Sequence, residues 1–200
     1  RDALARLVDT AEQAIAQVVS LLFITDRDVT PAKAPIPSLL ATAALHHGLL
    51  ERRLRSEAGI IVESGEPRKV MHFCLLCGYG ANAVNPYLAF ETISKLQHGG
   101  DLPRGRTVEE NIDQYIIAVK KGLLKTMSKM GISTLRSYHG AQQFEAVGLS
   151  RKLVDRYFTG TASRSGGAGL AAVAQGALAR PRSGFRAPEA GQLGLDYGGD

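Results

Sequence analysis

The chain alternates short apolar runs with longer stretches of helical periodicity, and this alternation restricts its fold more than any other feature. The runs have the length of β-strands and occupy residues 19–25, 59–62, 81–84 and 132–135. Alternating strands and helices favour a parallel sheet whose strands are joined by right-handed crossovers. Four such units are half of an eightfold barrel. The predicted fold is therefore α/β, with parallel β-α repeats forming a partial or degenerate TIM-like barrel.

The first run, residues 19–25, lacks the polar alternation of a half-exposed strand. A strand of this kind is typical of a parallel sheet that is covered on both faces. We therefore expect helices on either side of it.

The segments between the runs show the spacing of amphipathic helices. The predicted helices cover residues 4–18, 37–55, 66–79, 88–97, 109–130 and 171–180. Residues 70–77 also have the composition of a buried strand. A helix is preferred there because Val70, Phe73, Cys74 and Cys77 share one helical face and glycines follow as a stop signal.

Polar residues follow the apolar runs, and the carboxyl ends of parallel strands meet at one edge of a sheet. The candidate strand-end residues are Glu63, Ser64, Asn85, Tyr87, Ser137 and Tyr138. We expect them to converge on that edge. Two interpretations of these residues remain open: they line a functional surface, or they cap helices and tie loops. Glu63 is equally compatible with a general base and with a loop-holding carboxylate.

Cys74 and Cys77 form a C-x-x-C pair, the spacing found in redox and zinc sites. A redox pair needs a polarised thiol in a loop at a helix start, and a zinc site needs two more ligands at suitable spacing. The pair instead lies inside an apolar run. We expect two buried free thiols that pack as small hydrophobic side chains.

His46 and His47 are adjacent, so on a helix they point about 100° apart and do not chelate one metal ion together. We expect one ring to pack inward with a hydrogen bond and the other to meet solvent. The glycine-rich residues 165–169 would cradle a phosphate if they joined a strand to a helix. The sequence after them is only weakly helical, so a linker is the preferred interpretation.

Composition argues against two classes of partner. The net charge of +5 is carried by scattered residues, and aromatic residues make up only 6% of the chain. This composition does not favour a base-stacking surface, so nucleic-acid binding is not expected. No window of about 18 consecutive apolar residues is present, and membrane insertion is not expected either.

Five segments, in one order, resemble the central region of the glutamate synthase large subunit. They are IPSLLATAALHH at 36–47, VESGEPRKVMHF at 62–73, GYGANAVNPYLAFETI at 78–93, KGLLKTMSKMGISTLRSYHGAQQFEAVGL at 121–149 and YFTGTASR at 157–164. Several long motifs in one order are far more specific than a single signature. The resemblance implies a central α/β domain at residues 1–164 and a Gly/Pro/Ala-rich tail at 165–200, leading toward an FMN-binding domain.

The family's chemistry is distributed over several domains. An amidotransferase domain with an N-terminal Cys hydrolyses glutamine, and ammonia passes internally to a barrel that holds FMN and an iron–sulfur cluster. There it reacts with 2-oxoglutarate, and the imine is reduced to glutamate. The resemblance therefore implies FMN and an iron–sulfur cluster for the full-length enzyme, and neither for this piece.

For this chain the resemblance implies a non-catalytic role. No catalytic, cofactor-binding or metal residue is assigned to it, and the isolated chain is expected to be inactive. Its implied partners are the amidotransferase and FMN-binding domains of the same polypeptide. The implied location is the cytoplasm, or the plastid in a plant-type organism. In this interpretation the strand-end residues border the ammonia tunnel. The alternative is a self-sufficient barrel-type enzyme or ligand-binding module.

Overall fold

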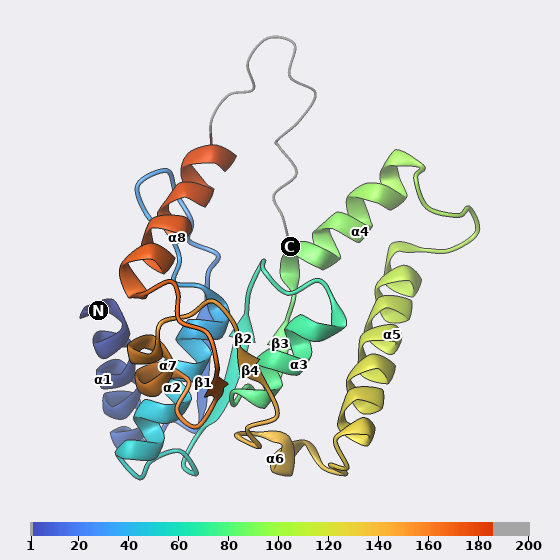
Figure 1. Cartoon of the computed structure of the whole chain (residues 1–200). Coiled ribbons are helices and arrows are strands. Elements are labelled where there is room, and N and C mark those ends of the chain that lie inside the picture. Colours follow the sequence, from blue (N-terminus) through green and yellow to red (C-terminus); the bar gives the residue numbers. More distant parts are fainter. Residues whose placement is uncertain (1, 186–200) are drawn as a thin grey trace.

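The computed structural model describes residues 2–185, in which helices surround a small parallel sheet (Figure 1). The helices are α1 (Asp2–Ala16), α2 (Ser38–Glu51), α3 (Val70–Gly78), α4 (Tyr87–Gly99), α5 (Val108–Lys129), α6 (Leu135–Tyr138), α7 (Arg151–Tyr157) and α8 (Leu170–Gly184). The strands are β1 (Leu21–Thr25), β2 (Gly59–Glu63), β3 (Ala83–Asn85), β4 (Glu145–Ala146) and β5 (Ala162–Ser163).

The main sheet has the order β1-β2-β3, and all its strands run parallel. Helix α2 connects β1 to β2, and α3 connects β2 to β3. The first three β-α units predicted from the sequence are therefore confirmed. In the described part of the chain the sheet is open, and no closed barrel forms. A second sheet consists only of the two-residue strands β4 and β5, which pair in parallel.

The predicted fourth strand, at residues 132–135, was wrong. Gly131 ends α5 with a positive φ of 71°, and Leu135 begins the short helix α6. Thr134 is the N-cap of α6, and its hydroxyl oxygen accepts a hydrogen bond from the backbone N–H of Ser137. A Thr that caps a helix start outweighs the strand preference of a four-residue run.

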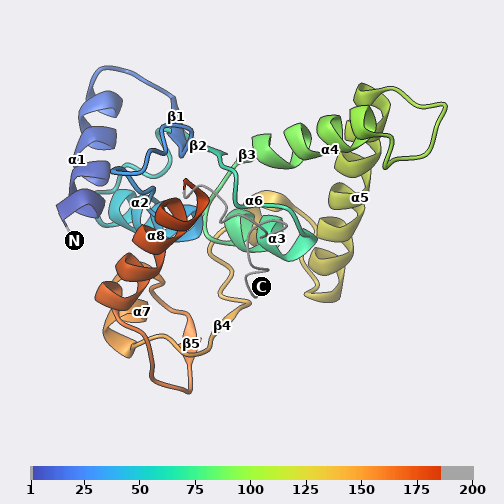
Figure 2. The ribbon, with the colours of Figure 1, turned by 90° about the horizontal axis from the view of Figure 1, so that it is seen from above.

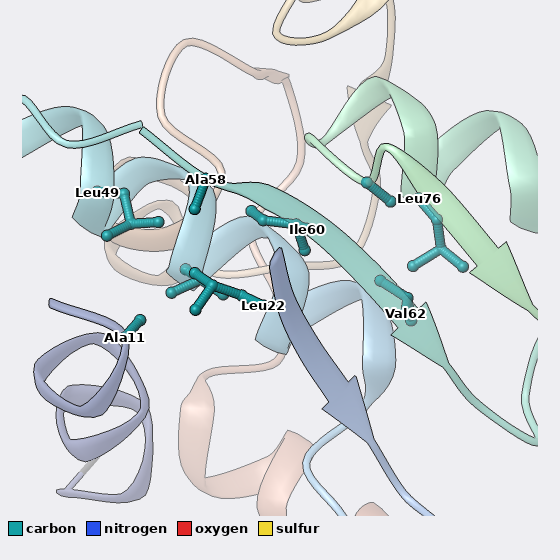
Figure 3. Close-up of a cluster of buried hydrophobic side chains, with 9 residues drawn as sticks. Ala11, Leu22, Leu49, Ala58, Ile60, Val62 and Leu76 are labelled. Carbon is teal, nitrogen blue, oxygen red and sulfur yellow. The ribbon is translucent and has the colours of Figure 1, made fainter. Parts of the chain in front are cut away.

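One face of the sheet carries the main hydrophobic core (Figure 3). Leu22, Ile60 and Val62 point from the strands toward Leu49 of α2 and Leu76 of α3. Both crossover helices therefore cover the same face. Helix α2 is apolar around most of its circumference, because its other side packs against α7 in a second cluster that contains Leu40, Ala43, Leu153 and Val154.

The opposite face of the sheet is bare in this chain. Side chains alternate between the two faces along a strand. Leu21 and Phe23 are 56% and 67% exposed, whereas Leu22 between them is buried. In Figure 2 the helices α2, α3, α7 and α8 lie on one side of the three strands. The expectation that residues 19–25 are covered on both faces was wrong for the described residues, because no helix of this part of the chain packs there.

Helix α3 is confirmed as a helix, and its last turn joins three packed clusters. Leu76 belongs to the main core, and Cys77 packs with Met127 and Tyr138 in a third cluster. Tyr79, the C-cap residue, packs against the second cluster.

The tail is partly helical. Helix α8 confirms the helix predicted at 171–180, and its residues Leu170 and Val173 pack against the second cluster. Residues 186–200, which complete the predicted linker, lie outside the described residues.

Candidate functional site at the carboxyl edge of the sheet

The ends of β1, β2 and β3 place three polar side chains in one row. Thr25 lies opposite Glu63, and Glu63 lies opposite Asn85 in the parallel register. Because opposed residues of neighbouring strands share a face, these side chains meet on the bare side of the sheet. They lie side by side because each of them is the last residue of its strand.

Glu63 is the centre of this row. Its carboxylate accepts hydrogen bonds from the Thr25 hydroxyl at 2.9 Å, from Arg27 Nε at 2.6 Å and from Asn85 Nδ2 at 3.4 Å. The hydrogen bond from Arg27, followed by that from Thr25, lowers the pKa of Glu63 below its ordinary value. A low pKa favours an ionised, hydrogen-bonded carboxylate and weakens its action as a general base at neutral pH.

A second carboxylate, Asp26, holds the start of the loop after β2 by hydrogen bonds. It accepts the Ser64 hydroxyl at 2.6 Å and the Gly65 backbone N–H at 3.1 Å. Burial, together with a hydrogen bond to Asp26, raises the pKa of Tyr87 to about 12. The guanidinium of Arg27 stacks 4.0 Å above the Tyr87 ring. This contact joins the hydrogen bonds around Glu63 to those around Asp26.

Of the six sequence-predicted residues, the edge brings together Glu63, Ser64, Asn85 and Tyr87. The remaining two do not join them, because the strand that was to carry them is absent. Ser137 is exposed on α6, and its backbone N–H is bonded by the cap residue Thr134. Tyr138 is buried, and its hydroxyl donates to the backbone carbonyl of Cys74 at 3.1 Å.

Two members of the edge, Thr25 and Glu91, are not among the strand-end residues that the sequence predicts, whereas Asp26 and Arg27 directly follow the first apolar run. Arg27 reaches Glu91 of α4 at 3.4 Å as well as Glu63. Glu91 lies four residues after Tyr87 on the same helix, a spacing that places both side chains on one face. The spacing of four residues from Tyr87 is the sequence signal from which Glu91 could have been predicted.

The edge is thus a hydrogen-bonding surface whose carboxylates already have donors within the chain. It offers a polar wall to a small neutral molecule. Within residues 2–185, no three His, Cys, Asp or Glu side chains gather as candidate metal ligands.

The two cysteines are free and buried, as expected. Burial raises the pKa of Cys77 to about 11, with the neighbouring Cys74 as the second cause. A thiol with this pKa is almost entirely protonated at neutral pH and is a poor nucleophile.

A buried polar cluster surrounds His46, which is only 6% exposed. Arg55 Nε donates to His46 Nδ1 at 3.0 Å, and the same guanidinium donates to the carbonyls of Ala58 and Gly80 at 2.7 and 2.8 Å. His46 is therefore the inward-facing member of the histidine pair, and His47 is half-buried. Sequence reasoning did not predict the role of Arg55, because its partners are 3 to 27 residues away in the chain.

This cluster predicts a loss of stability in mild acid. Burial, and then the charge of Arg55, lower the pKa of His46 from 6.5 to about 3. Between these values the unfolded chain binds a proton that the folded chain does not, so the free energy of unfolding falls as pH falls. The slope is about 1.4 kcal/mol per pH unit for one such group.

The check is urea unfolding of the wild type and of the variants His46→Gln and His47→Gln at pH 7, 6 and 5. We expect His46→Gln to flatten the pH dependence clearly, and His47→Gln, at a half-buried position, to flatten it less. Equal slopes in wild type and His46→Gln would contradict a neutral His46.

An open cleft of about 980 Å³ lies between α1, α2 and α7. Its floor is apolar, with Leu4, Val8 and Leu153, and its rim carries Lys152 and Arg156. None of the six predicted residues lines it.

No helix within residues 2–185 combines the length and the apolar character needed to cross a membrane.

Comparison with known proteins assigns the family. Residues 1–150 match the family described as glutamate synthase central domain. The large chain of the NADPH glutamate synthase of Bacillus subtilis is 49% identical over 179 residues, which are 88% of this chain and 11% of that protein. The NADH glutamate synthase of Schizosaccharomyces pombe is 41% identical over 92% of this chain and 9% of that protein. The ferredoxin-dependent enzyme of Antithamnion sp. is 41% identical over 83% of this chain and 12% of that protein.

The matched proteins are amino-acid biosynthetic oxidoreductases of several domains, and this chain corresponds to one α/β domain within them. The chain belongs to the glutamate synthase central domain family. It spans about a tenth of the length of the relatives that it matches.

Proposed function

We propose that this chain works as the non-catalytic domain that joins the glutaminase and FMN-dependent synthase sites of a glutamate synthase and borders the passage of ammonia between them. The whole enzyme would convert glutamine, 2-oxoglutarate and a reductant to two molecules of glutamate. FMN and an iron–sulfur cluster would reside in other domains of the polypeptide. The proposed location is the cytoplasm, or the plastid in a plant-type organism.

The observation that carries this proposal is the polar edge of the sheet. Its two carboxylates, Asp26 and Glu63, are held by hydrogen bonds from this chain, so the edge is a preformed wall rather than a reactive centre. Ammonia is small and neutral, and a hydrogen-bonding wall without a free acid would let it pass without trapping it as ammonium. The relatives that use NADPH, NADH and ferredoxin match this chain at similar identity, which fits a role independent of the electron donor.

We also propose that β1, β2 and β3 correspond to part of a barrel of TIM type. Consecutive parallel strands with both crossover helices on one face are the arrangement of such barrels. The alternative, a self-sufficient barrel-type enzyme or ligand-binding module, is less well supported. It needs a reactive group at the strand ends, where both carboxylates are already engaged.

The test is the coupling of the full-length enzyme, measured as glutamate formed per glutamine consumed. Tyr87→Phe removes the hydroxyl that interacts with Asp26. We expect the ratio to fall below the value of two for full coupling, toward the value of one that glutamine hydrolysis alone would give. Glu63→Gln should lower the ratio in the same direction, because it removes the charge that positions Arg27. Ammonia-dependent synthesis should stay at the wild-type rate.

The matched control is Glu12→Gln, because Glu12 is also an ion-paired carboxylate but lies on α1, away from the edge. It should leave the ratio unchanged. A wild-type ratio in Tyr87→Phe and Glu63→Gln, with only stability reduced, would show that the edge is structural and would refute the passage.

A further inference from the structure

Three distant segments of the chain meet at Glu66, in the loop after β2. Its carboxylate oxygen Oε2 accepts hydrogen bonds from the backbone N–H and the hydroxyl of Ser38, both at 2.7 Å. Pro37, the N-cap residue of α2, makes no side-chain cap, so Glu66 supplies the acceptor at this helix start. The other oxygen, Oε1, accepts a hydrogen bond from Arg180 of α8 at 2.6 Å. One carboxylate therefore holds the start of α2 and a residue of α8 together.

The backbone of Glu66 joins the same contact to the polar edge at the ends of β1, β2 and β3. The Glu66 N–H donates to Ser64 Oγ at 3.1 Å, and the Ser64 hydroxyl donates to Asp26 at 2.6 Å. The Gly65 N–H between them also donates to Asp26. Because Asp26 in turn interacts with Tyr87, a continuous chain of polar contacts runs from α8 to the edge.

Helix α8 contacts the rest of the domain near both of its ends. Its first turn packs on the second cluster through Leu170 and Val173. Arg180 lies about 10 Å farther along the helix, next to the buried Pro181. Pro181 has no backbone N–H for the carbonyl four residues earlier, so the helix itself is weaker at this point. The pair with Glu66 therefore has a large influence on where the last turns of α8 lie.

We infer that Glu66 is a positioning residue that keeps α8 and the polar edge in one arrangement. A displacement of α8 moves the carboxylate, and the backbone of Glu66 transfers the movement to Ser64 and Asp26. The inference rests on the proposed function, in which α8 belongs to the tail that leads toward the FMN-dependent domain. It goes further by naming the contact through which the position of that tail reaches the wall of the ammonia passage.

Hydrogen exchange of the full-length enzyme, measured by mass spectrometry of its peptides, tests the inference. Arg180→Met keeps a long, helix-compatible side chain and removes the donor to Glu66. We expect the amides of residues 60–69, which include Gly65 and Glu66, to exchange on the order of threefold faster, the effect of losing a partly exposed ion pair. Arg180→Lys should restore the wild-type exchange, because it returns a cationic donor at this position.

The matched control is Arg182→Met on the same helix. Two residues are about 200° apart around a helix, so Arg182 lies on the side opposite Arg180. This variant should leave the exchange of residues 60–69 unchanged. Equal acceleration in Arg180→Met and Arg182→Met would overturn the inference, because any loss of charge on α8 would then suffice. Faster exchange confined to α8 in Arg180→Met would also overturn it, because the pair would then anchor α8 alone.

The consequence for the enzyme is measured as glutamate formed per glutamine consumed. We expect this ratio to fall in Arg180→Met and to return to the wild-type value in Arg180→Lys, a rescue that a general loss of stability would not give.

The inference and the proposed function can fail separately. Faster exchange of residues 60–69 in Arg180→Met, with a wild-type ratio in Arg180→Met and Glu63→Gln, would support the positioning role and refute the ammonia passage. A lowered ratio in Glu63→Gln, with unchanged exchange in Arg180→Met, would support the passage and overturn the positioning role.

Discussion

Replacement of Arg55 by Ala is expected to lower the free energy of unfolding by about 3 kcal/mol. The Arg55 guanidinium donates to His46 Nδ1, to the carbonyls of Ala58 and Gly80, and to Asn82 Oδ1. Burial lowers the pKa of Arg55, which indicates that the charge is partly desolvated and depends on these acceptors. Its removal leaves several acceptors without a donor in the interior, and this is the costly part of the change.

The matched control is Arg52→Ala, three residues earlier. Arg52 pairs with Asp9 and Glu12, but both carboxylates are about half exposed. Such a surface pair is worth about 0–1 kcal/mol. Arg55→Lys should fall between the two, because an ammonium cannot reproduce the fork of donors. Urea unfolding of all three variants gives the comparison, and similar losses for Arg52→Ala and Arg55→Ala would argue against a special role for Arg55.

Gly80→Ala is expected to be about as harmful, at roughly 3 kcal/mol. Gly80 has a φ of +111°, where only glycine is unstrained, and a Cβ atom there would lie 2.3 Å from His46 Nδ1. The buried His46 ring has to move, and its hydrogen bond with Arg55 breaks. The cost therefore combines backbone strain with overpacking.

Gly100→Ala separates the two contributions. Gly100 also has a positive φ, of 81°, but its Cβ would meet no atom within 4 Å. Only the strain of about 1 kcal/mol should remain. Equal losses at the two glycines, measured by denaturant unfolding, would mean that the contact with His46 is unimportant. Because Gly80 and Arg55 share His46, we expect their combined effect to be smaller than the sum.

The helices and the first three strands were predictable because their signals are local. The helix predicted at 109–130 is observed as Val108–Lys129, with Thr107 and Glu110 forming a capping box at its start. The fourth strand was misassigned because residues 132–135 are apolar only at their ends, and the intervening Thr134 caps a helix. Strands β4 and β5 pair over two residues each, and helix α7 has seven; none of the three was predicted.

Site residues were predicted correctly only where the strand before them is observed in the structure. Glu63, Ser64, Asn85 and Tyr87 follow β2 and β3, so the strand-end rule placed them together. Ser137 and Tyr138 depended on the strand that is absent. The apolar run at β1 indicated burial on both faces, but a sequence cannot reveal whether the second cover comes from the same domain. For this reason the sequence predicts burial of Phe23, which is 67% exposed in the described domain.

The last turn of α3 gives the domain an unusual internal linkage. Leu76, Cys77 and Tyr79 each contact a different one of the three hydrophobic clusters. Local opening of one cluster therefore disturbs the last turn of α3, which also packs in the other two. Opening one cluster alone then costs more free energy. We therefore expect the three clusters to unfold together rather than one at a time. In the function proposed above, such cooperative folding would help to keep the two reaction centres at a fixed separation.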